Sequence, residues 1–404
     1  MKHFSFLLGS GFSIPDGYPS TSQLNEKLKK INADEIKIHT SMSARFLDEG
    51  EKDLNPWSGK EDKLFVQRFL EFYNERILQG KEFHYEDFYD FYIELHSTET
   101  LDEKCQKFFD DFRKESGQED DHNNFLMRFN YTFNQLVYKQ LYRWPEQVSF
   151  ENECEPSYAA FLNLLEELKK DYKIHLHSLN HDLLVEKLAH SFTIGENFSD
   201  GFEEIGSPFY GDHHHSEKIE DRFITKVVHP VRLRRFANEF SKVFCLYKLH
   251  GSVDNYDFNF ENKEYTMIKV PYGVQKESLR KEYFNKEGKR DYYSDFFQIT
   301  PDFLSGTTKK VLSYNRGHYY KSLFDHFTDN LIESDFLIVI GYGFGDKKIN
   351  EYLIDAFLVD EKKRMIVIDI RKPQSELMNY KNARFIEKSV SDVTRDEIYN
   401  QMES

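Results

Sequence analysis

The sequence predicts an α/β protein: a Rossmann-like, mostly parallel sheet with helices on both faces and a large helical insertion. Short apolar runs such as Phe4–Leu8, Phe336–Ile340 and Met365–Ile370 are typical of parallel strands that are buried on both faces. Helical patterns separate such runs, as in consecutive βαβ units. Several of the expected strands end in polar or glycine-bearing loops. Ligands of open α/β sheets bind at such strand ends, near the point where the strand order reverses.

The other elements follow from apolar spacing along the chain. Thr21 or Ser22 is expected to cap the helix after the first strand. The remaining strands are expected at Lys173–Leu179, Phe244–Leu249, Phe336–Ile340, Met365–Ile370 and Ala383–Ile386, with helices at 157–168, 183–190, 312–330 and 348–359. Glu264–Val270 is expected to pair with the Phe244–Leu249 strand. The segment 197–220, with its glycines and histidines, is expected to be a loop.

A single domain is expected over residues 1–404, with a helical insertion at 33–157. Within that segment, residues 63–143 show apolar side chains at helical spacing, and no shift in composition marks a linker. The aromatic run at 83–89 is expected to be helical core, or an oligomer contact if it is exposed. The insertion is therefore expected to be part of one fold.

Composition excludes several classes of protein. The chain has 54 Lys and Arg against 70 Asp and Glu, which argues against a surface that grips phosphate backbones, so direct nucleic-acid binding is not expected. The three cysteines, Cys105, Cys154 and Cys245, are too far apart for a C-x-x-C zinc motif or a disulfide framework. No apolar stretch approaches the roughly 20 residues that cross a bilayer, and no signal peptide is recognised. We expect a cytoplasmic protein that does not enter membranes.

The loop Gly9-Ser10-Gly11-Phe12-Ser13 follows the first strand. Its glycines would let the backbone approach a pyrophosphate, and the following helix would supply donors and a positive dipole. Ser10 and Ser13 add hydroxyl groups. Because many strand–helix turns contain glycine for steric reasons alone, this loop by itself fits a packing role equally well.

Polar residues also end the second and third strands. Asn180 offers a donor and an acceptor to a ribose hydroxyl or a water, and Asp182 can accept from a carboxamide; both residues also suit the cap of the next helix. His250 is either a base that works near neutral pH or a packed histidine at a strand end. Gly251 beside it is expected to leave room for a ligand.

The loop 341–346, Gly-Tyr-Gly-Phe-Gly-Asp, follows a wholly apolar strand and precedes a helix. It is not G-x-G-x-x-G, so the standard dinucleotide fingerprint is not met. Asp369 ends the next strand, where an acidic side chain commonly contacts an adenosine ribose. The alternative is that Asp369 is an ordinary carboxylate at a strand end, with no role in binding. Together the loops predict a dinucleotide site.

In this order the segments resemble the sirtuin superfamily, in particular its prokaryotic branch of sirtuin-like antiphage NAD hydrolases. Patterns of the form GxGFSxxxGxPS, LNxD, KLHGS and VIGYGFGD recur in that branch. Near copies of all four occur here, between residues 5 and 370. The segment 33–157 contributes little to the resemblance.

The resemblance implies an NAD site without a metal, in which NAD is the substrate. Asn180 would position the nicotinamide ribose or the attacking water, Asp182 would bind the carboxamide, and His250 would act as the base. Residues 9–13 would hold the phosphates and cover the nicotinamide side, and residues 341–343 would cradle the adenosine half. The implied assignments are catalytic for Asn180 and His250, and NAD-binding for Gly9, Ser10, Gly11, Phe12, Ser13, Asp182, Gly251, Gly341, Tyr342, Gly343 and Asp369.

The implied reaction is hydrolysis of the nicotinamide–ribose bond to ADP-ribose and nicotinamide. This bond breaks through an oxocarbenium-like state, and the leaving group is already cationic, so no general acid is needed. Protein-deacylating sirtuins carry a four-cysteine zinc module, a Q-N-x-D loop and an Asp-Phe-Arg element. This chain has three cysteines, Leu179 in place of the glutamine, and Gly17-Tyr18-Pro19-Ser20 in place of the third element. These departures weigh against deacylation.

The resemblance also implies an effector of bacterial antiphage defence that acts by depleting NAD. The chain stops soon after the last expected strand, so no separate sensor domain is expected. Control is then expected from a homo-oligomer or from a partner, by analogy with sirtuin subunits of similar length that pair with a HerA-type hexameric ATPase. The alternatives are a non-catalytic subunit that senses NAD or ADP-ribose, and a protein deacylase.

Two further clusters stand outside this pattern. His213, His214 and His215 follow Asp212, but adjacent histidines rarely bind one ion, so no metal site is expected there. Arg232, Arg234 and Arg235 are expected to lie on a solvated helix face rather than on a nucleic-acid contact.

Overall fold

The structure is a computed structural model. It describes residues 1–38, 44–53, 55, 58–142, 156–190, 194–219, 222–260, 264–271, 273–274, 278–294, 300–303 and 318–403. These residues fall into two compact units. The first contains residues 1–17 and the described parts of 156–303 and 318–403, and the second contains the described parts of 18–142. The helices that the sequence places in an insertion at 33–157 therefore lie mostly in the second unit, which already begins at Tyr18.

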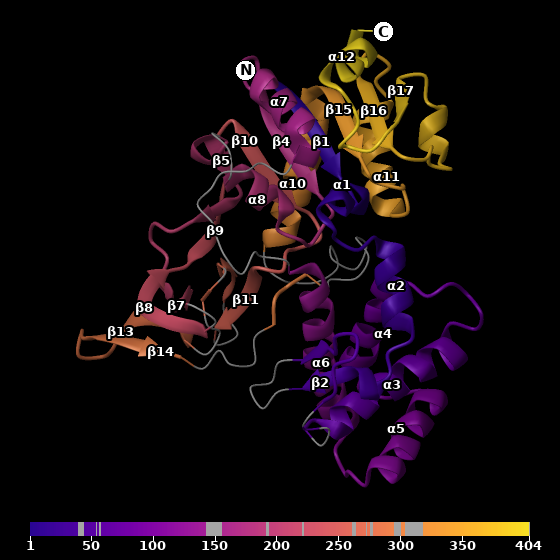
Figure 1. The fold of residues 1–404 in the computed structure, drawn as a ribbon, viewed down its shortest axis with the longest axis vertical. Coiled ribbons are helices and arrows are strands. Elements are labelled where there is room, and N and C mark those ends of the chain that lie inside the picture. Colours follow the sequence, from indigo (N-terminus) through magenta and orange to yellow (C-terminus); the bar gives the residue numbers. More distant parts are fainter. Residues whose placement is uncertain are drawn as a thin grey trace. The chain divides into compact units, whose positions relative to one another are not determined.

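The first unit is built on a seven-stranded sheet in the order β17-β16-β15-β1-β4-β10-β5, and all neighbouring strands are parallel (Figure 1). The strands are β1 (Lys2–Leu8), β4 (Tyr172–Ser178), β5 (Phe198–Ser199), β10 (Phe244–Lys248), β15 (Ser334–Ile340), β16 (Arg364–Asp369) and β17 (Ala383–Glu387). From β1 the chain adds β4 and β10 on one side, and later β15, β16 and β17 on the other. The strand order thus reverses between β1 and β15, as in doubly wound dinucleotide-binding folds, which confirms the predicted fold class.

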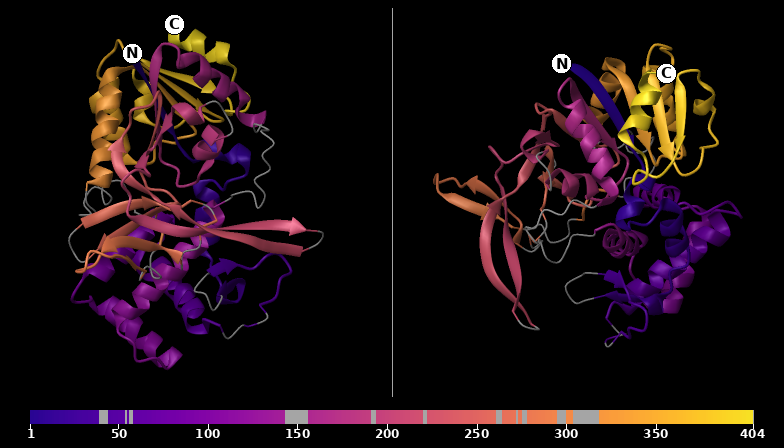
Figure 2. Two further views of the ribbon diagram at one scale, coloured as in Figure 1. Left: turned by 90° about the vertical axis from the view of Figure 1, so that its left-hand side faces the viewer. Right: turned by 45° about the horizontal axis from the view of Figure 1, so that its top comes forward.

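Helices cover both faces of this sheet (Figure 2). Helix α10 (Tyr319–Glu333) lies on one face, and α7 (Ala159–Leu168) and α12 (Arg395–Glu403) lie on the other. The alternation of side chains along β1 explains the arrangement. Ser5 points to α10, where its Oγ donates to the Asn330 carbonyl over 3.4 Å. Phe6 points the other way, and its ring meets the edge of Phe161 in α7 with 5.7 Å between centroids.

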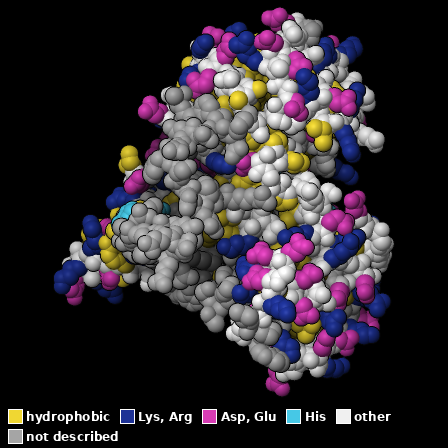
Figure 3. All heavy atoms as spheres, in the orientation of Figure 1, with side chains coloured by type: hydrophobic (Ala, Val, Ile, Leu, Met, Phe, Trp, Pro, Cys, Tyr) yellow, Lys and Arg dark blue, Asp and Glu magenta, His cyan; other side chains and the backbone are white. Residues whose placement is uncertain are grey.

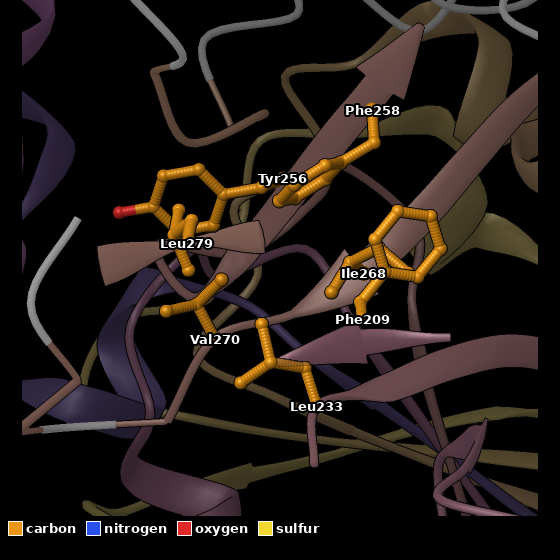
Figure 4. Packing of buried hydrophobic residues seen from close by; sticks show 7 residues of the cluster. All are labelled: Phe209, Leu233, Tyr256, Phe258, Ile268, Val270 and Leu279. Carbon is orange, nitrogen blue, oxygen red and sulfur yellow. The ribbon is translucent and has the colours of Figure 1, made fainter. Parts of the chain in front are cut away.

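The chain between β5 and α10 adds two four-stranded antiparallel sheets, in the orders β11-β12-β9-β6 and β14-β13-β7-β8. Their strands are β6 (Gly201–Glu203), β7 (Phe209–Ile219), β8 (Arg222–Arg232), β9 (Arg234–Glu239), β11 (Asn255–Phe260), β12 (Glu264–Lys269), β13 (Arg280–Phe284) and β14 (Arg290–Tyr293). Apolar side chains from both sheets share one core, shown in Figure 4: Phe209, Leu233, Tyr256, Phe258, Ile268, Val270 and Leu279.

Three expectations for this region are wrong. The segment 197–219 holds β5, β6 and β7 instead of a loop. Arg232, Arg234 and Arg235 lie on β8 and β9, not on a helix. Glu264–Val270 does not pair with β10, because β12 pairs with β11 and β9. The first two have a common cause: a strand with one exposed face carries polar side chains on that face, so the apolar signal that marks a buried strand is weak there. In the third, the strand itself is present and only its expected partner is wrong.

The second unit is a helical body with a small hairpin. Its elements are α2 (Thr21–Lys29), α3 (Lys60–Phe72), α4 (Tyr85–Ser97), α5 (Glu103–Ser116), α6 (His122–Leu141), β2 (Ile36–Ile38) and β3 (Ala44–Phe46). Its core consists largely of phenylalanine rings. Phe69 is fully buried, and its ring centroid lies 4.9 Å from that of Phe129 in an edge-to-face contact, a geometry that aromatic pairs prefer.

The cap of α2 differs from the expected one by a residue or two. Ser20, not Thr21 or Ser22, is the N-cap, and its Oγ accepts from the Gln23 backbone N–H while the Gln23 side chain accepts from the Ser20 N–H. A reciprocal capping box takes a glutamate or glutamine three residues after the cap, and only Ser20 of the three candidates has one there, Gln23.

Among the described residues, no helix combines the length and the apolarity that crossing a membrane would require. Acidic and basic side chains are interspersed on the face of each unit that Figure 3 presents.

Candidate ligand site at the switch point

Four loops at the carboxyl edge of the parallel sheet form the candidate site; we call them the switch-point loops. They follow β1 (residues 9–17), β4 (179–183), β10 (249–254) and β15 (341–346). Each contacts the next. The Gly11 N–H donates to the Gly341 carbonyl over 2.9 Å and the Val253 N–H to the His181 carbonyl over 3.0 Å. The structure thus brings together segments that are far apart in sequence, as the strand-end argument expects.

Two further contacts close the ring of loops. The Asn180 side chain ties the loop after β4 to the loop after β1, because its Nδ2 donates to the Gly9 carbonyl over 2.8 Å. The loop after β10 reaches the loop after β15, with His250 Nε2 3.6 Å from Asp346 Oδ2. Both predicted catalytic residues therefore lie in adjoining switch-point loops.

Three of the glycines are required by contact between the loops after β1 and β15. A Cβ on Gly9 would lie 2.6 Å from the Gly341 oxygen, and a Cβ on Gly11 would lie 2.6 Å from the Gly341 Cα. Gly341 has φ +64, and a Cβ there would overlap the Gly11 backbone. Sterics therefore account for these glycines, which is one of the two explanations that the sequence leaves open, and backbone contact brings the two strands at the reversal point together.

Residues 10–13 form the single helical turn α1 (Ser10–Ser13) rather than an open loop. Phe12 is fully buried. Its ring packs against a tilted Tyr158 ring and edge-to-face against Phe161, at 5.2 and 5.1 Å between centroids, and its carbonyl accepts from the Tyr158 hydroxyl over 2.7 Å. Its side chain belongs to the core in this conformation. Ser13 is also buried, and it faces the loop after β4.

Asn180 uses both amide hydrogens within the protein, since Nδ2 donates to the Gly9 carbonyl and, over 3.0 Å, to Ser13 Oγ. What it can offer a ligand in this conformation is its acceptor oxygen. Asp182 Oδ1 accepts from the Leu184 N–H over 3.0 Å and so caps α8 (Leu184–His190), the alternative role that the sequence allows. Burial raises the pKa of Asp182, while Lys248 and its hydrogen bonds oppose that rise.

His250 is buried, with 4% of its surface exposed. Burial lowers its pKa and the Asp346 carboxylate partly offsets that effect, so the imidazole is neutral near pH 7 and able to take a proton. The His181 ring centroid lies 6.4 Å from that of His250, and burial, with smaller contributions from His250 and Lys248, lowers the pKa of His181 to about 3.

Gly251 does not leave an empty space beside His250, contrary to the expectation. It has φ +83, and a Cβ there would overlap the Asp302 carbonyl and lie 2.7 Å from the Tyr320 hydroxyl. The position requires glycine because the backbone at 302 packs on it.

The loop after β15 has an exposed and a buried side. Gly343 is exposed, and a Cβ there would have no atom within 4 Å. Tyr342 is buried, with its hydroxyl 3.1 Å from Asn350 Oδ1. Phe344 has φ +58, an uncommon conformation for a residue with a side chain and one that clusters at functional sites. Its carbonyl accepts from Asn350 Nδ2 over 2.9 Å, which holds the strained turn.

Asp346 is a site residue that the sequence reasoning missed. Its Oδ1 accepts from the backbone N–H groups of Lys348 and Ile349 over 2.8 and 3.2 Å and caps α11 (Lys347–Leu353). Its other oxygen faces His250. The available signal was the aspartate that closes the Gly-x-Gly-x-Gly-Asp loop. Asp369, by contrast, ends β16, and its Oδ1 accepts from the Arg371 N–H in its own turn over 3.2 Å.

A chain of alternating charges supports the loops after β4 and β10, and it too was missed; most of its side chains are buried, but that of Arg234 is 44% exposed. Its members are Lys248, Glu186, Lys269, Asp200, Arg234 and Asp254. Lys248 Nζ donates to the Asp182 carbonyl and lies 3.9 Å from Glu186. Lys269 contacts Glu186 at 3.2 Å and Asp200 at 2.7 Å. Arg234 then pairs with both Asp200 oxygens, at 2.9 and 3.0 Å.

The charges in this chain stabilise one another. Burial alone would raise the pKa of Asp200, but Lys269 and Arg234 lower it to about 2. Burial would also lower the pKa of Lys269, yet Asp200, Asp254 and Glu186 raise it. At Asp254 burial outweighs the opposing effect of Lys269, and its pKa is raised.

Among the described residues, no three His, Cys, Asp or Glu side chains are grouped as a metal ion would need. His213 lies on β7 with its ring centroid 5.4 Å from that of His229 on β8, and the side chains of His214 and His215 lie outside the described ones. The expectation that no metal is used stays a prediction.

Comparison with protein-family models and with curated proteins gives no match for this chain.

Proposed function

We propose that this chain binds NAD at the switch-point loops and hydrolyses its nicotinamide–ribose bond to give ADP-ribose and nicotinamide. The observation that supports this most is the meeting of the four loops at the strand-order reversal between β1 and β15, where open α/β sheets bind dinucleotides. Asn180 and the neutral His250 lie in adjoining loops there, which supplies an acceptor and a base in one place.

In the proposed reaction the bond from the anomeric carbon to the nicotinamide nitrogen breaks, and its electron pair leaves with nicotinamide, which becomes neutral. The ribosyl cation that remains is attacked by water. Asn180 Oδ1 accepts from a ribose hydroxyl or from that water. His250 accepts the proton that the water or the hydroxyl loses, and later releases it to solvent.

The biological role that we propose with this activity is that of an antiphage effector that depletes NAD, held in check by self-assembly or by a partner such as a HerA-type ATPase. Both parts rest on the resemblance in the four motifs. Protein deacylation is the weaker choice, because the chain has only three cysteines and a four-cysteine zinc module cannot be built.

A second candidate is a subunit that binds NAD or ADP-ribose without turnover. Its support is that Asn180 is only 9% exposed, with both its amide hydrogens already engaged, and that His250 is 4% exposed. A site this enclosed fits a sensor that opens on binding as well as it fits an enzyme.

Chromatographic assay of nicotinamide release from NAD tests the proposal. We expect His250→Ala to lower the rate by at least about 100-fold, the share that a general base commonly contributes. The matched control is His229→Ala, at an exposed histidine of β8, which should keep the wild-type rate. Equal release by His250→Ala and wild type would show that the catalytic assignment is wrong. Binding of NAD without release by the wild type would favour the sensor.

A further inference from the structure

The two oxygens of Asp346 have different surroundings. Oδ1 caps α11 through the N–H groups of Lys348 and Ile349. Oδ2 lies 3.6 Å from His250 Nε2. One carboxylate thus serves the helix with one atom and faces the predicted base with the other. The geometry points to Asp346 as the positioning residue of His250: it holds the proton on Nε2, so that Nδ1 is the nitrogen that accepts a proton in the reaction. The rate part of this inference rests on the proposed function.

The backbone around Asp346 is held in one conformation. Asn350, one turn into α11, binds the carbonyl of the left-handed Phe344 over 2.9 Å. The Asn350 N–H donates to the Asp346 carbonyl over 3.1 Å. A strained turn persists only where its surroundings fix it. Here the fixed turn places the Asp346 side chain so that it contacts both the N-terminus of α11 and His250.

Other charged or titratable groups also surround His250. His181 faces it from the loop after β4, at 6.4 Å between ring centroids. Lys248, two residues earlier, directs its Nζ to the Asp182 carbonyl and to Glu186. Asp302 packs on Gly251, and its carboxylate accepts from the Tyr320 hydroxyl over 3.2 Å. Lys248 and a protonated His181 would disfavour the imidazolium, whereas Asp346 favours it.

The chemistry of imidazole assigns the roles of the two ring nitrogens. Neutral imidazole carries one N–H and one acceptor nitrogen. A carboxylate beside Nε2 keeps the hydrogen there and stabilises the imidazolium once Nδ1 has taken a proton. The distance of 3.6 Å is too long for a formed hydrogen bond, but contacts of this kind commonly tighten when the ligand binds.

The simpler explanation is that Asp346 is only a helix cap. Asparagine caps helices about as well as aspartate. Asp346→Asn therefore keeps the cap and removes the charge that faces His250. The matched control is Asp121→Asn in the second unit, where Asp121 caps α6 by accepting from the Asn124 N–H over 2.8 Å.

The first experiment needs no NAD. The imidazole signals are followed by NMR during a pH titration, and the His250 signal is assigned by its loss in His250→Gln. We expect Asp346→Asn to lower the pKa of His250 by about 1 unit, since an opposite charge this close commonly shifts a pKa by that much or more. Asp121→Asn should leave the His250 signal unchanged. A His250 pKa equal in Asp346→Asn and wild type would overturn the inference.

The second experiment measures nicotinamide release. We expect Asp346→Asn to lower kcat by about 10- to 100-fold, with KM changed by less than about threefold because Asp346 acts on the base rather than on bound NAD. In the His250→Ala background the same substitution should cost nothing further, since the residue through which it acts is gone. An equal loss in both backgrounds would refute the positioning role. If the wild type releases no nicotinamide but Asp346→Asn still lowers the His250 pKa, the proposed function is refuted and the pairing of His250 with Asp346 stands.

Discussion

At the scale of single residues, two glycines of one loop have opposite surroundings. Gly341 is in the left-handed region, and any side chain there would collide with the Gly11 backbone. Gly343, two residues on, faces open space. The first glycine therefore belongs to the packing of the fold, whereas the second is available to a ligand. Sequence spacing alone gives both residues the same role.

Gly341→Ala should destabilise the protein by about 2 kcal/mol or more, because the left-handed conformation alone costs an alanine about 1–2 kcal/mol and the backbone contact must also open. Gly343→Ala should change the free energy of unfolding by less than about 0.5 kcal/mol. Urea denaturation measures both changes in the free energy of unfolding, provided that its dependence on urea concentration has the same slope in the variants and the wild type. Equal stability of the two variants would show that the loop contact does not form.

The Gly343→Ala variant also tests whether Gly343 contacts a ligand. If NAD passes over this exposed glycine, Gly343→Ala weakens NAD binding in calorimetry while leaving stability unchanged. Unchanged affinity would remove Gly343 from the predicted site.

Motifs reveal which residues lie at strand ends, but not what each atom does there. Asn180 could be placed at the site because it follows a buried strand. That both its amide hydrogens bind Gly9 and Ser13 depends on a contact between segments that lie 171 and 167 positions apart. Asp346 was missed for the same reason, since its partner His250 is on another loop. Long-range pairing of this kind leaves no local pattern.

At the scale of elements, the charge chain links β10, α8, β12 and β9. Lys269 on β12 is its centre, with Asp200 and Glu186 at 2.7 and 3.2 Å and Asp254 at 3.6 Å. Removing one charged side chain from a buried ion pair destabilises the fold, because the charge of its partner is then left buried without compensation. These charged residues therefore connect one antiparallel sheet, through β9 and β12, to helix α8 and to β10.

Lys269→Met should lower the free energy of unfolding by about 3–5 kcal/mol, because it leaves several buried carboxylates without their central cation. Lys289→Met is the matched control: Lys289 is 76% exposed in a surface pair with Glu287, and such pairs contribute about 0–1 kcal/mol. Chemical denaturation followed by circular dichroism compares the two. A Lys269→Met protein as stable as the control would mean that the cluster is energetically neutral.

The parallel strands could be predicted because they are buried on both faces and appear as unbroken apolar runs, as in Phe336–Ile340. The antiparallel strands could not. β7, for example, contains three consecutive histidines and two charged residues of opposite sign after them, so neither apolar runs nor strict alternation marks it. Its structure is set by pairing with β8, which is information that a local reading of the chain does not contain.

At the scale of the whole molecule, buried histidines make stability depend on pH. Burial, with smaller effects of His3 and Lys173, lowers the pKa of His175 to about 3, and burial lowers that of His177 well below its usual value. His181 behaves alike. In the unfolded chain these side chains take up protons near pH 6.5. Between about pH 6.5 and 3 the unfolded state therefore binds more protons than the native state, and acid destabilises the fold.

The free energy of unfolding should fall as the pH drops from 6.5 to 4, by up to about 1.4 kcal/mol per pH unit for each such histidine. His175→Gln removes one titrating group and keeps an amide near the Tyr247 hydroxyl, which lies 3.2 Å from His175 Nδ1. The free energy of unfolding of His175→Gln should therefore fall less steeply with decreasing pH than that of the wild type, by the contribution of one histidine. Urea midpoints at several pH values measure the slopes, and parallel curves for the two proteins would contradict the explanation.

The neighbours β1 and β15 come from opposite ends of the sequence: Ser5 and Ser334 hydrogen-bond across 329 positions. A ribosome that adds about 5–20 residues per second needs on the order of tens of seconds to span that interval. Throughout this time β1 lacks β15, its neighbour on one side in the finished sheet. No nascent chain that stops short of β15 can contain the crevice, so whatever chemistry occurs there is withheld until synthesis is nearly finished.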